Sequence, residues 1–325
     1  MRRMIFDFGS EKVRMGVQGS KRPPYTMPAV VAHRPPGEVV AVGEEALHMV
    51  GRTPADIETE RPFGRGGVRS PRLAEALLRT MMTQRGVGAR RPELWIALSA
   101  GASPIDQRGL KQLAQKAGAA RVRFCPAAAC RALGLDLPLF APQGSLLIDV
   151  GASCTRVDLL SLGRPVASRR VDAAGDTLDL AVGRLLRDHY NLMVGDTTAR
   201  TVKHRLLGDD EPEAVANGRD LVTGLPHAVT LQRAELLPAL VLLADQITLA
   251  VQDLLRDVSP ELVADLADQG CHLTGGSATL QALAGLLQDR LELPLLRDGQ
   301  PEETICRGLQ LALDHGQGER LGLTA

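Results

Sequence analysis

The sequence contains one short pattern twice, with the two copies 142 positions apart. Each copy is an apolar run that ends in Asp-x-Gly and continues, after a few small or polar residues, into a second apolar run. The first copy has Asp7 and Gly9, followed by a run over residues 13–17, and the second copy has Asp149 and Gly151. Two strands joined by a tight turn account for this pattern, which therefore predicts two halves that each open with a β-hairpin.

An Asp-x-Gly turn at the end of a strand suits a metal-bound phosphate. Glycine lets backbone N–H groups approach an anion closely, and a carboxylate holds Mg²⁺, usually through its waters. We therefore predict that Asp7 and Asp149 face each other and hold Mg²⁺ on one nucleotide clamped between the two halves. The alternative, in which both are ordinary turn formers, does not account for their repetition in this order.

A third glycine step follows a predicted strand at 271–274. Gly275-Gly276-Ser277 connects that strand to a helix, and such a turn lets a nucleotide lie against backbone. Alone it is usually a structural turn, but after two Asp-x-Gly hairpins it is predicted to lie under the nucleotide. The chain has neither G-x-x-x-x-G-K-[ST] nor a G-x-G-x-x-G after a strand, which argues against a P-loop NTPase and a Rossmann dinucleotide fold.

Composition narrows the functional class. At 325 residues the chain is long for one core, so two domains are expected. The 38 basic and 38 acidic residues give no net charge and aromatics are 2%, which argues against a nucleic-acid partner. Five scattered cysteines indicate free thiols. The longest apolar run in the helical part, 236–244, is about half of a membrane-spanning helix, and no signal peptide precedes the first strand, so we expect a cytoplasmic protein.

Strands that alternate with helices indicate an α/β fold. Helices are predicted to begin at Ser70-Pro71 and at Ser103-Pro104, because serine caps a helix and proline suits its first turn. The remaining expectations concern helix ends and connections: a cap at Asp176, a helix from about 234 to 258, a last helix starting at Pro301, a hinge at 138–144 and a loose tail at 316–325.

The order hairpin, hairpin, Gly-Gly turn resembles the actin, Hsp70 and sugar-kinase superfamily. Longer segments are similar to the MreB and Mbl bacterial actins: residues 42–46 with 51–54, residues 190–195, and above all 218–226, which is almost verbatim. The resemblance runs from about residue 4 to about residue 313. It implies an actin-like ATPase fold of two RNase H-like halves around ATP, head-to-tail filaments, and a role in cell shape and cell-wall synthesis.

The resemblance also implies domain limits and site residues. Domain I would span 1–143, with a small subdomain inserted at about 33–66 and a helix at about 301–316 packing back on it. Domain II would span 144–300, with an insertion at about 184–244. The nucleotide-binding residues implied by the family motifs are Asp7, Gly9, Ser10, Glu11, Lys12, Asp149, Gly151, Ala152, Ser153, Gly175, Arg200, Lys203, Gly275, Gly276, Ser277 and Ala278, with Asp7 and Asp149 as the Mg²⁺ residues.

Asp106 has two interpretations. Aligned on Gly101, the glutamate that positions water in the family falls on Asp106, which makes it the candidate catalytic residue. The segment Ser103-Pro-Ile-Asp106 is equally a capping box, in which Asp106 only completes the start of a helix.

The sequence differs from the family mainly in the residues expected to contact the nucleotide. The family's Ala-Asn-Thr becomes Glu11-Lys12-Val13, and a carboxylate about 5 Å from a phosphate costs roughly 3 kcal/mol at an effective dielectric near 20, which Lys12 or Mg²⁺ would offset. Its Gly-Gly-Gly-Thr becomes residues 151–154, where each glycine lost from a positive-φ position costs about 1 kcal/mol. Its Glu-Pro becomes Ala127-Ala128. These changes predict weakened hydrolysis, at most a slow ATPase coupled to polymerisation.

Three functions remain open. The first is a filament-forming actin that pairs with itself or with another MreB-like actin and acts with cell-wall elongation proteins. The second is a paralogue that no longer hydrolyses ATP and modulates another filament. The third is a sugar-kinase-type phosphotransferase, for which only Asp106 offers a base. The basic loop 84–91 suggests weak peripheral membrane contact, with a solvated loop as the alternative.

Overall fold

The computed structural model describes residues 2–20, 22–65, 67–84, 91–209 and 211–321. The chain forms two compact units. Unit 1 contains residues 1–142, 160–165 and 302–325, and unit 2 contains 143–159 and 166–301. Each unit has its own sheet and its own hydrophobic core.

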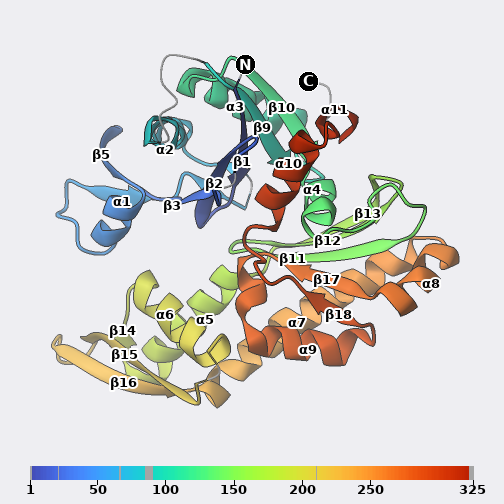
Figure 1. Cartoon of the computed structure of the whole chain (residues 1–325). Coiled ribbons are helices and arrows are strands. Elements are labelled where there is room, and N and C mark those ends of the chain that lie inside the picture. The colour runs from blue at the N-terminus through green and yellow to red at the C-terminus, as the bar shows by residue number, and fades with distance from the viewer. Residues whose placement is uncertain (1, 21, 66, 85–90, 210, 322–325) are drawn as a thin grey trace. The chain divides into compact units, whose positions relative to one another are not determined.

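The sheet of unit 1 has five strands in the order β10-β9-β1-β2-β3 (Figure 1). These strands are β1 (Arg3–Phe8), β2 (Lys12–Val17), β3 (Tyr25–Pro28), β9 (Glu93–Leu98) and β10 (Arg121–Pro126). β1 and β2 form the predicted hairpin, which is antiparallel, whereas β9 and β10 join parallel to β1. The hairpin register places Asp7 directly opposite Arg14.

Helices cover both faces of this sheet. α2 (Pro71–Gln84) and α3 (Pro104–Ala117) share a core with Met4 and Phe6 of β1. Side chains alternate along a strand, so Ile5 points to the opposite face, where α4 (Ala127–Gly134) and α10 (Thr304–Asp314) contact the sheet. Both predicted Ser-Pro helix starts are confirmed, since α2 and α3 begin at the two prolines.

Unit 1 also contains a small sheet in the order β5-β4-β6. Its strands are β4 (Val31–Arg34), β5 (Glu38–Val42) and β6 (Glu58–Glu60), and α1 (Glu44–Met49) shares a separate small core with them through Ala46. The short pair β7 (Phe63–Gly64) and β8 (Gly67–Val68) follows.

The sheet of unit 2 repeats the strand arrangement of unit 1, in the order β13-β12-β11-β17-β18. The strands are β11 (Ser145–Val150), β12 (Thr155–Ser161), β13 (Arg164–Val171), β17 (Cys271–Thr274) and β18 (Leu295–Arg297). β17 pairs parallel with both β11 and β18. The second hairpin and the strand before the Gly-Gly turn are therefore neighbours in one sheet.

The helices of unit 2 are α5 (Gly175–Tyr190), α6 (Asp196–Leu207), α7 (Arg233–Arg256), α8 (Pro260–Gln269) and α9 (Gln281–Leu291). A 3-10 helix, Gly276–Thr279, precedes α9. A three-stranded sheet is formed by β14 (Leu192–Met193), β15 (Glu213–Asp220) and β16 (Pro226–Gln232).

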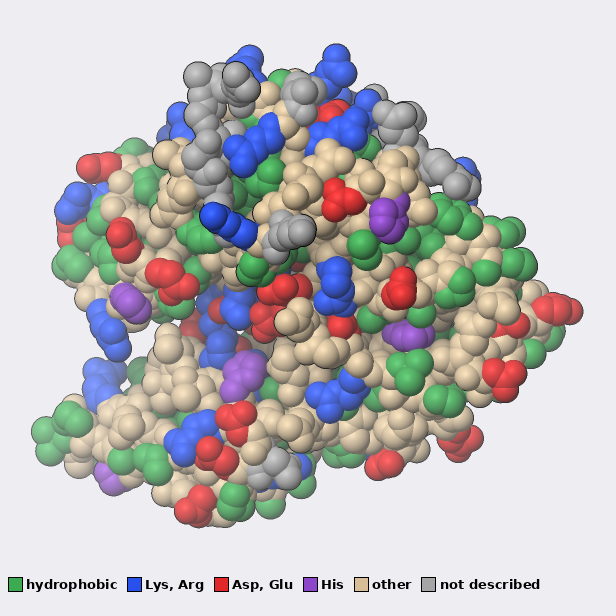
Figure 2. Space-filling view, in the orientation of Figure 1, with side chains coloured by type: hydrophobic (Ala, Val, Ile, Leu, Met, Phe, Trp, Pro, Cys, Tyr) green, Lys and Arg blue, Asp and Glu red, His purple; other side chains and the backbone are tan. Residues whose placement is uncertain are grey.

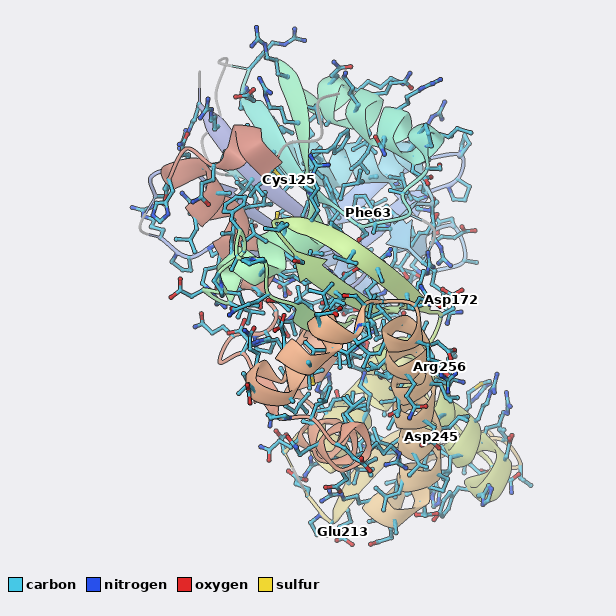
Figure 3. All side chains as sticks on the ribbon, turned by 90° about the vertical axis from the view of Figure 1, so that its right-hand side faces the viewer. Phe63, Cys125, Asp172, Glu213, Asp245 and Arg256 are labelled. Carbon is cyan, nitrogen blue, oxygen red and sulfur yellow. The ribbon has the colours of Figure 1, made fainter. Side chains whose placement is uncertain are left out.

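Among the described residues, one helix, α7, is long and apolar enough to cross a membrane by length and composition alone. Its apolar face is part of the core of unit 2, because Leu236, Leu240 and Ile247 are fully buried there. Its other face carries charge: Asp245 and Arg256 lie along α7 in Figure 3, and Asp245 forms a 2.6 Å ion pair with Arg290 of α9. We therefore interpret α7 as a core helix.

Three expectations about helix ends were wrong. The last long helix begins at Thr304 instead of Pro301. The tail is not loose at its start, because Gly318–Leu321 forms a short helix, α11, with Leu321 buried. The cap of α5 is Ala174 instead of Asp176, and the hydroxyl of Thr177 accepts the backbone N–H of Ala174 at 3.2 Å.

Candidate functional site

The first loop joins β1 to β2 and is shaped by Gly9. A Cβ at this position would lie 2.4 Å from the carbonyl oxygen of Lys12, a distance that no side chain can occupy. Glycine therefore permits a tight turn. Ser10, Glu11 and Lys12 all lie within five positions of Asp7 in this turn. The first loop thus has the compact backbone that the sequence predicted.

Arg14 neutralises Asp7 inside unit 1. The Arg14 guanidinium lies 3.8 Å from a carboxylate oxygen of Asp7, and it donates at 2.7 Å to Glu302. Lys12 donates to the same carboxylate of Glu302 at 3.0 Å. Arg14 is only 8% exposed. The analysis of residues 13–17 as an apolar run was therefore wrong at this position, which holds a buried cation.

Glu302 is the shared partner of these two cations. Burial by itself would raise the pKa of its carboxyl group, but hydrogen bonds from Lys12 and Arg14 and their positive charge outweigh burial, so the pKa lies below its usual range. The carboxylate of Glu302 is therefore charged at neutral pH and holds both cations in place.

Glu11 has a different partner from the one expected. Arg61 forms a close ion pair with Glu11, and the same guanidinium donates to the carbonyl oxygen of Ser10 at 3.5 Å. Lys12, which was expected to offset the charge of Glu11, is instead bonded to Glu302. The negative charge of Glu11 is thus balanced by Arg61, which lies between β6 and β7, 50 positions later in the sequence.

The second loop closes without the strain that its missing glycines suggested. The N–H of Gly151 donates to the carbonyl oxygen of Cys154 at 3.1 Å. Ala152 and Ser153 are not among the described non-glycine residues with positive φ. Alanine and serine at these positions therefore carry no left-handed backbone cost.

The Gly-Gly turn packs directly on the second loop. Gly275 has φ of +90°, and a Cβ there would lie 2.5 Å from the carbonyl oxygen of Val150 and 2.7 Å from a carboxylate oxygen of Asp149. The hydroxyl of Ser277 donates to the carbonyl oxygen of Gly151 at 2.7 Å, and that of Thr274 lies 3.4 Å from Asp149. Only glycine at position 275 permits this approach.

The start of α5 joins the same cluster. Its first N–H groups, those of Gly175 and Asp176, donate to the carbonyl oxygens of Gly151 and Ala152 at 3.3 and 2.7 Å. Lys203 of α6 then donates to the carbonyl oxygen of Gly175 at 3.2 Å. Unit 2 therefore brings together residues from four segments: the second loop, α5, α6 and the turn before α9.

Asp179 is the residue of this cluster that sequence reasoning missed. Its carboxylate lies 2.7 Å from the ammonium of Lys203 and 3.4 Å from the guanidinium of Arg200. Lys203 is only 4% exposed, so this carboxylate balances its buried charge. Burial, followed by the charge of Lys203, lowers the pKa of the neighbouring His204. The available signal was the position of Asp179, one helical turn after Gly175.

Asp106 lies at the exposed start of α3, where it completes a capping box. Its carboxylate accepts from the backbone N–H of Ser103 at 3.0 Å and from the hydroxyl of Ser103 at 2.7 Å. These hydrogen bonds lower the pKa of Asp106. The contacts observed are those of helix capping, which was one of the two interpretations.

Comparison with known proteins identifies the family. The sequence model of the MreB/Mbl protein family matches residues 2–319. The cell shape-determining protein Mbl of Bacillus subtilis is 32% identical over 316 residues, which cover 95% of this chain and 95% of that protein. This chain belongs to the MreB/Mbl family. MreB of Escherichia coli is 32% identical over 299 residues, 88% of this chain and 86% of that protein.

Solved structures agree with the MreB/Mbl assignment. The crystal structures of MreB5 of Spiroplasma citri bound to ADP and to AMPPNP each have a TM-score of 0.91, 26% identity and 98% coverage of both chains. The MamK double helical filament has a TM-score of 0.80 and covers 96% of this chain and 99% of MamK, at 20% identity. The predicted actin-like α/β fold is confirmed, and the chain is a homologue of actin-like cell-shape proteins.

The residues fit a nucleotide better in unit 2 than in unit 1. In unit 2, Gly275 keeps the backbone beside Asp149 clear of side chains, and Lys203, paired with Asp179, donates to the carbonyl oxygen of Gly175 nearby. In unit 1, Asp7 already faces the guanidinium of Arg14, so this carboxylate does not fit a second, divalent cation. Within the described residues no group of three or more His, Cys, Asp or Glu side chains could hold a metal ion.

Most of the basic loop proposed for membrane contact, residues 85–90, lies outside the described residues. Basic and acidic side chains are interspersed over most of the face shown in Figure 2, in keeping with the equal numbers of both.

Proposed function

We propose that this MreB/Mbl-family chain binds ATP through both Asp-x-Gly loops and the turn over residues 275–278, and assembles into filaments that contribute to cell shape and cell-wall synthesis. The two units would be the two actin-like domains that share the nucleotide, with Mg²⁺ on the Asp149 side. The observation that carries the proposal is the hydrogen-bonded cluster of unit 2, in which Asp149, Gly151, Gly175, Lys203 and Ser277 come together. Relatives of the same fold crystallised with ADP and AMPPNP support it.

The partners and location follow from the same proposal. The chain would polymerise with itself or with another MreB-like actin in the cytoplasm, and act with cell-wall elongation proteins. Weak peripheral contact with the membrane through the loop around residues 84–91 remains part of this proposal.

Two measurements test the proposal. Isothermal titration should show ATP binding by the wild-type chain, and Lys203→Met should weaken it about tenfold or more, because the buried cation beside Gly175 is lost. The control is Lys116→Met, at an exposed position of α3, which should bind as the wild type does. High-speed pelleting should recover the wild-type chain with ATP and Mg²⁺. Absence of ATP binding removes the nucleotide proposal, and absence of pelleting removes self-assembly.

A second candidate, a paralogue that binds ATP without turning it over, is favoured by one observation. The carboxylate of Asp106, the candidate catalytic residue, accepts two hydrogen bonds from Ser103. A single-turnover assay separates the two: phosphate release at a rate no faster than without protein supports the paralogue, and faster release supports a slow ATPase.

A further inference from the structure

The first loop of unit 1 lies within a group of ion pairs. Three acidic groups (Asp7, Glu11 and Glu302) and three basic groups (Lys12, Arg14 and Arg61) are gathered at and around this loop. The loop therefore carries no net charge of its own when all six are ionised. A half-site that depended on a divalent cation would be expected to present uncompensated carboxylates to it.

Arg14 is the residue that makes this loop different. The hairpin register places it opposite Asp7, and cross-strand neighbours of opposite charge attract each other. The side chain of Arg14 is almost completely buried. The second terminal nitrogen of its guanidinium donates at 2.7 Å to Glu302, which lies 288 positions later in the sequence. One buried guanidinium thus contacts two carboxylates, one on β1 and one just before α10.

We propose that Arg14, held by Glu302, serves as a built-in cation for the first loop, so that this loop engages a nucleotide polyphosphate without recruiting Mg²⁺ through Asp7. The inference rests on the proposed function and deepens it, because it assigns the charge that meets the phosphates on this side of the site. Arg14 neutralises Asp7, and Lys12, whose side chain is 43% exposed and bonded to the same Glu302, is the more accessible of the two cations.

The shared carboxylate of Glu302 distinguishes this proposal from a purely structural ion pair. Lys12 and Arg14 share one carboxylate, so removing Glu302 leaves two cations beside the loop, whereas removing Arg14 leaves Asp7 and Glu302 as two carboxylates near each other. The two substitutions therefore change the local charge in opposite directions. A purely structural ion pair would give the two variants the same effect on ATP binding, namely none beyond a loss of stability.

The first test measures ATP affinity with Mg²⁺ and in EDTA for the wild type, Arg14→Met and Glu302→Gln. Arg14→Met should bind ATP in EDTA about tenfold more weakly than the wild type, and Glu302→Gln should bind it more tightly, because the first substitution removes a positive charge beside the loop and the second removes a negative one. The matched control is Arg123→Met, which removes one of two cations around Glu93 in the same sheet and should leave both affinities unchanged.

The second test needs no nucleotide. Arg14→Met should gain a Mn²⁺ site, seen by electron paramagnetic resonance as loss of the free-ion signal, because Asp7 and Glu302 both lose the guanidinium that contacts them. Asp7→Asn added to that variant should abolish the site, and the wild type should show none. If ATP binds to no variant in either buffer, the proposed function fails, and the Mn²⁺ titration still decides this inference.

Three results would overturn the proposal: unchanged ATP affinities in EDTA for both variants, a shift of both in the same direction, or Mn²⁺ binding by the wild type as tight as by Arg14→Met. If Arg14→Met does not fold, Glu302→Gln still tests the proposal, because Glu302 is partly exposed and its substitution should raise the affinity for ATP.

Discussion

At the scale of single residues, the contacts of a side chain decide between roles that its sequence position leaves open. Asp106 follows Ser103 by three positions, which suits a capping box, and it also aligns with the water-positioning glutamate of the family. In the structure, both hydrogen bonds of the Asp106 carboxylate come from Ser103. Arg14 shows the reverse case, since an ordinary position in a strand turns out to hold a buried charge opposite Asp7.

Substitutions at the start of α3 test the capping role. Ser103→Ala should lower the free energy of unfolding by about 1 kcal/mol, the usual cost of a lost helix cap, and Asp106→Ala should act in the same direction. Urea unfolding measures both, and a single-turnover ATPase assay should give the same rate for both variants and the wild type. A rate that falls for Asp106→Ala but not for Ser103→Ala would show that the carboxylate acts on the nucleotide.

At the scale of elements, two glycines let α4 and α10 pack at backbone contact in unit 1. A Cβ at Gly308 would lie 1.6 Å from the carbonyl oxygen of Cys130, and a Cβ at Gly134 would lie 2.0 Å from that of Thr304. Glu302 comes two positions before α10, so this close docking also sets where Glu302 meets Arg14.

Gly308→Ala should therefore destabilise unit 1 strongly. Overpacking of this kind costs about 3 kcal/mol or more when backbone must move, and urea unfolding measures it. Gly109→Ala in α3 is the control, because nothing lies within 4 Å of its added Cβ, and it should stabilise by about 0.5–1 kcal/mol. Equal effects of the two substitutions would contradict the close packing of α4 and α10.

At the scale of the whole molecule, assembly requires exposed surface that can be buried by a neighbouring copy. The turn between β15 and β16 offers apolar side chains to solvent, with Val222 81% and Leu225 65% exposed. The carboxylate of Asp220 accepts the N–H groups of Val222 and Thr223 at 2.8 and 2.6 Å, which holds this turn in one shape. Exposed apolar groups on a rigid turn are typical of contact surfaces.

Val222→Asp should accordingly impair the proposed filaments. The critical concentration for pelleting should rise about tenfold or more, the loss expected for one central apolar contact, while ATP affinity stays unchanged. Leu162→Asp is the matched control, because Leu162 is 63% exposed on the turn between β12 and β13. If Val222→Asp pellets as the wild type does, the β15–β16 turn is not an assembly contact.

The sequence alone was sufficient for the two hairpins, the Gly-Gly turn, both Ser-Pro helix starts and the family, because each depends on residues that are neighbours in the chain. Hydrophobic alternation, proline and glycine determine the backbone conformation of residues a few positions away, and the spacing within motifs identifies the family. The partners of the charged residues required the tertiary structure. Arg14 meets Glu302 and Lys203 meets Asp179 only when distant segments pack, since a buried charge is balanced by whichever opposite charge the fold brings within a few ångströms.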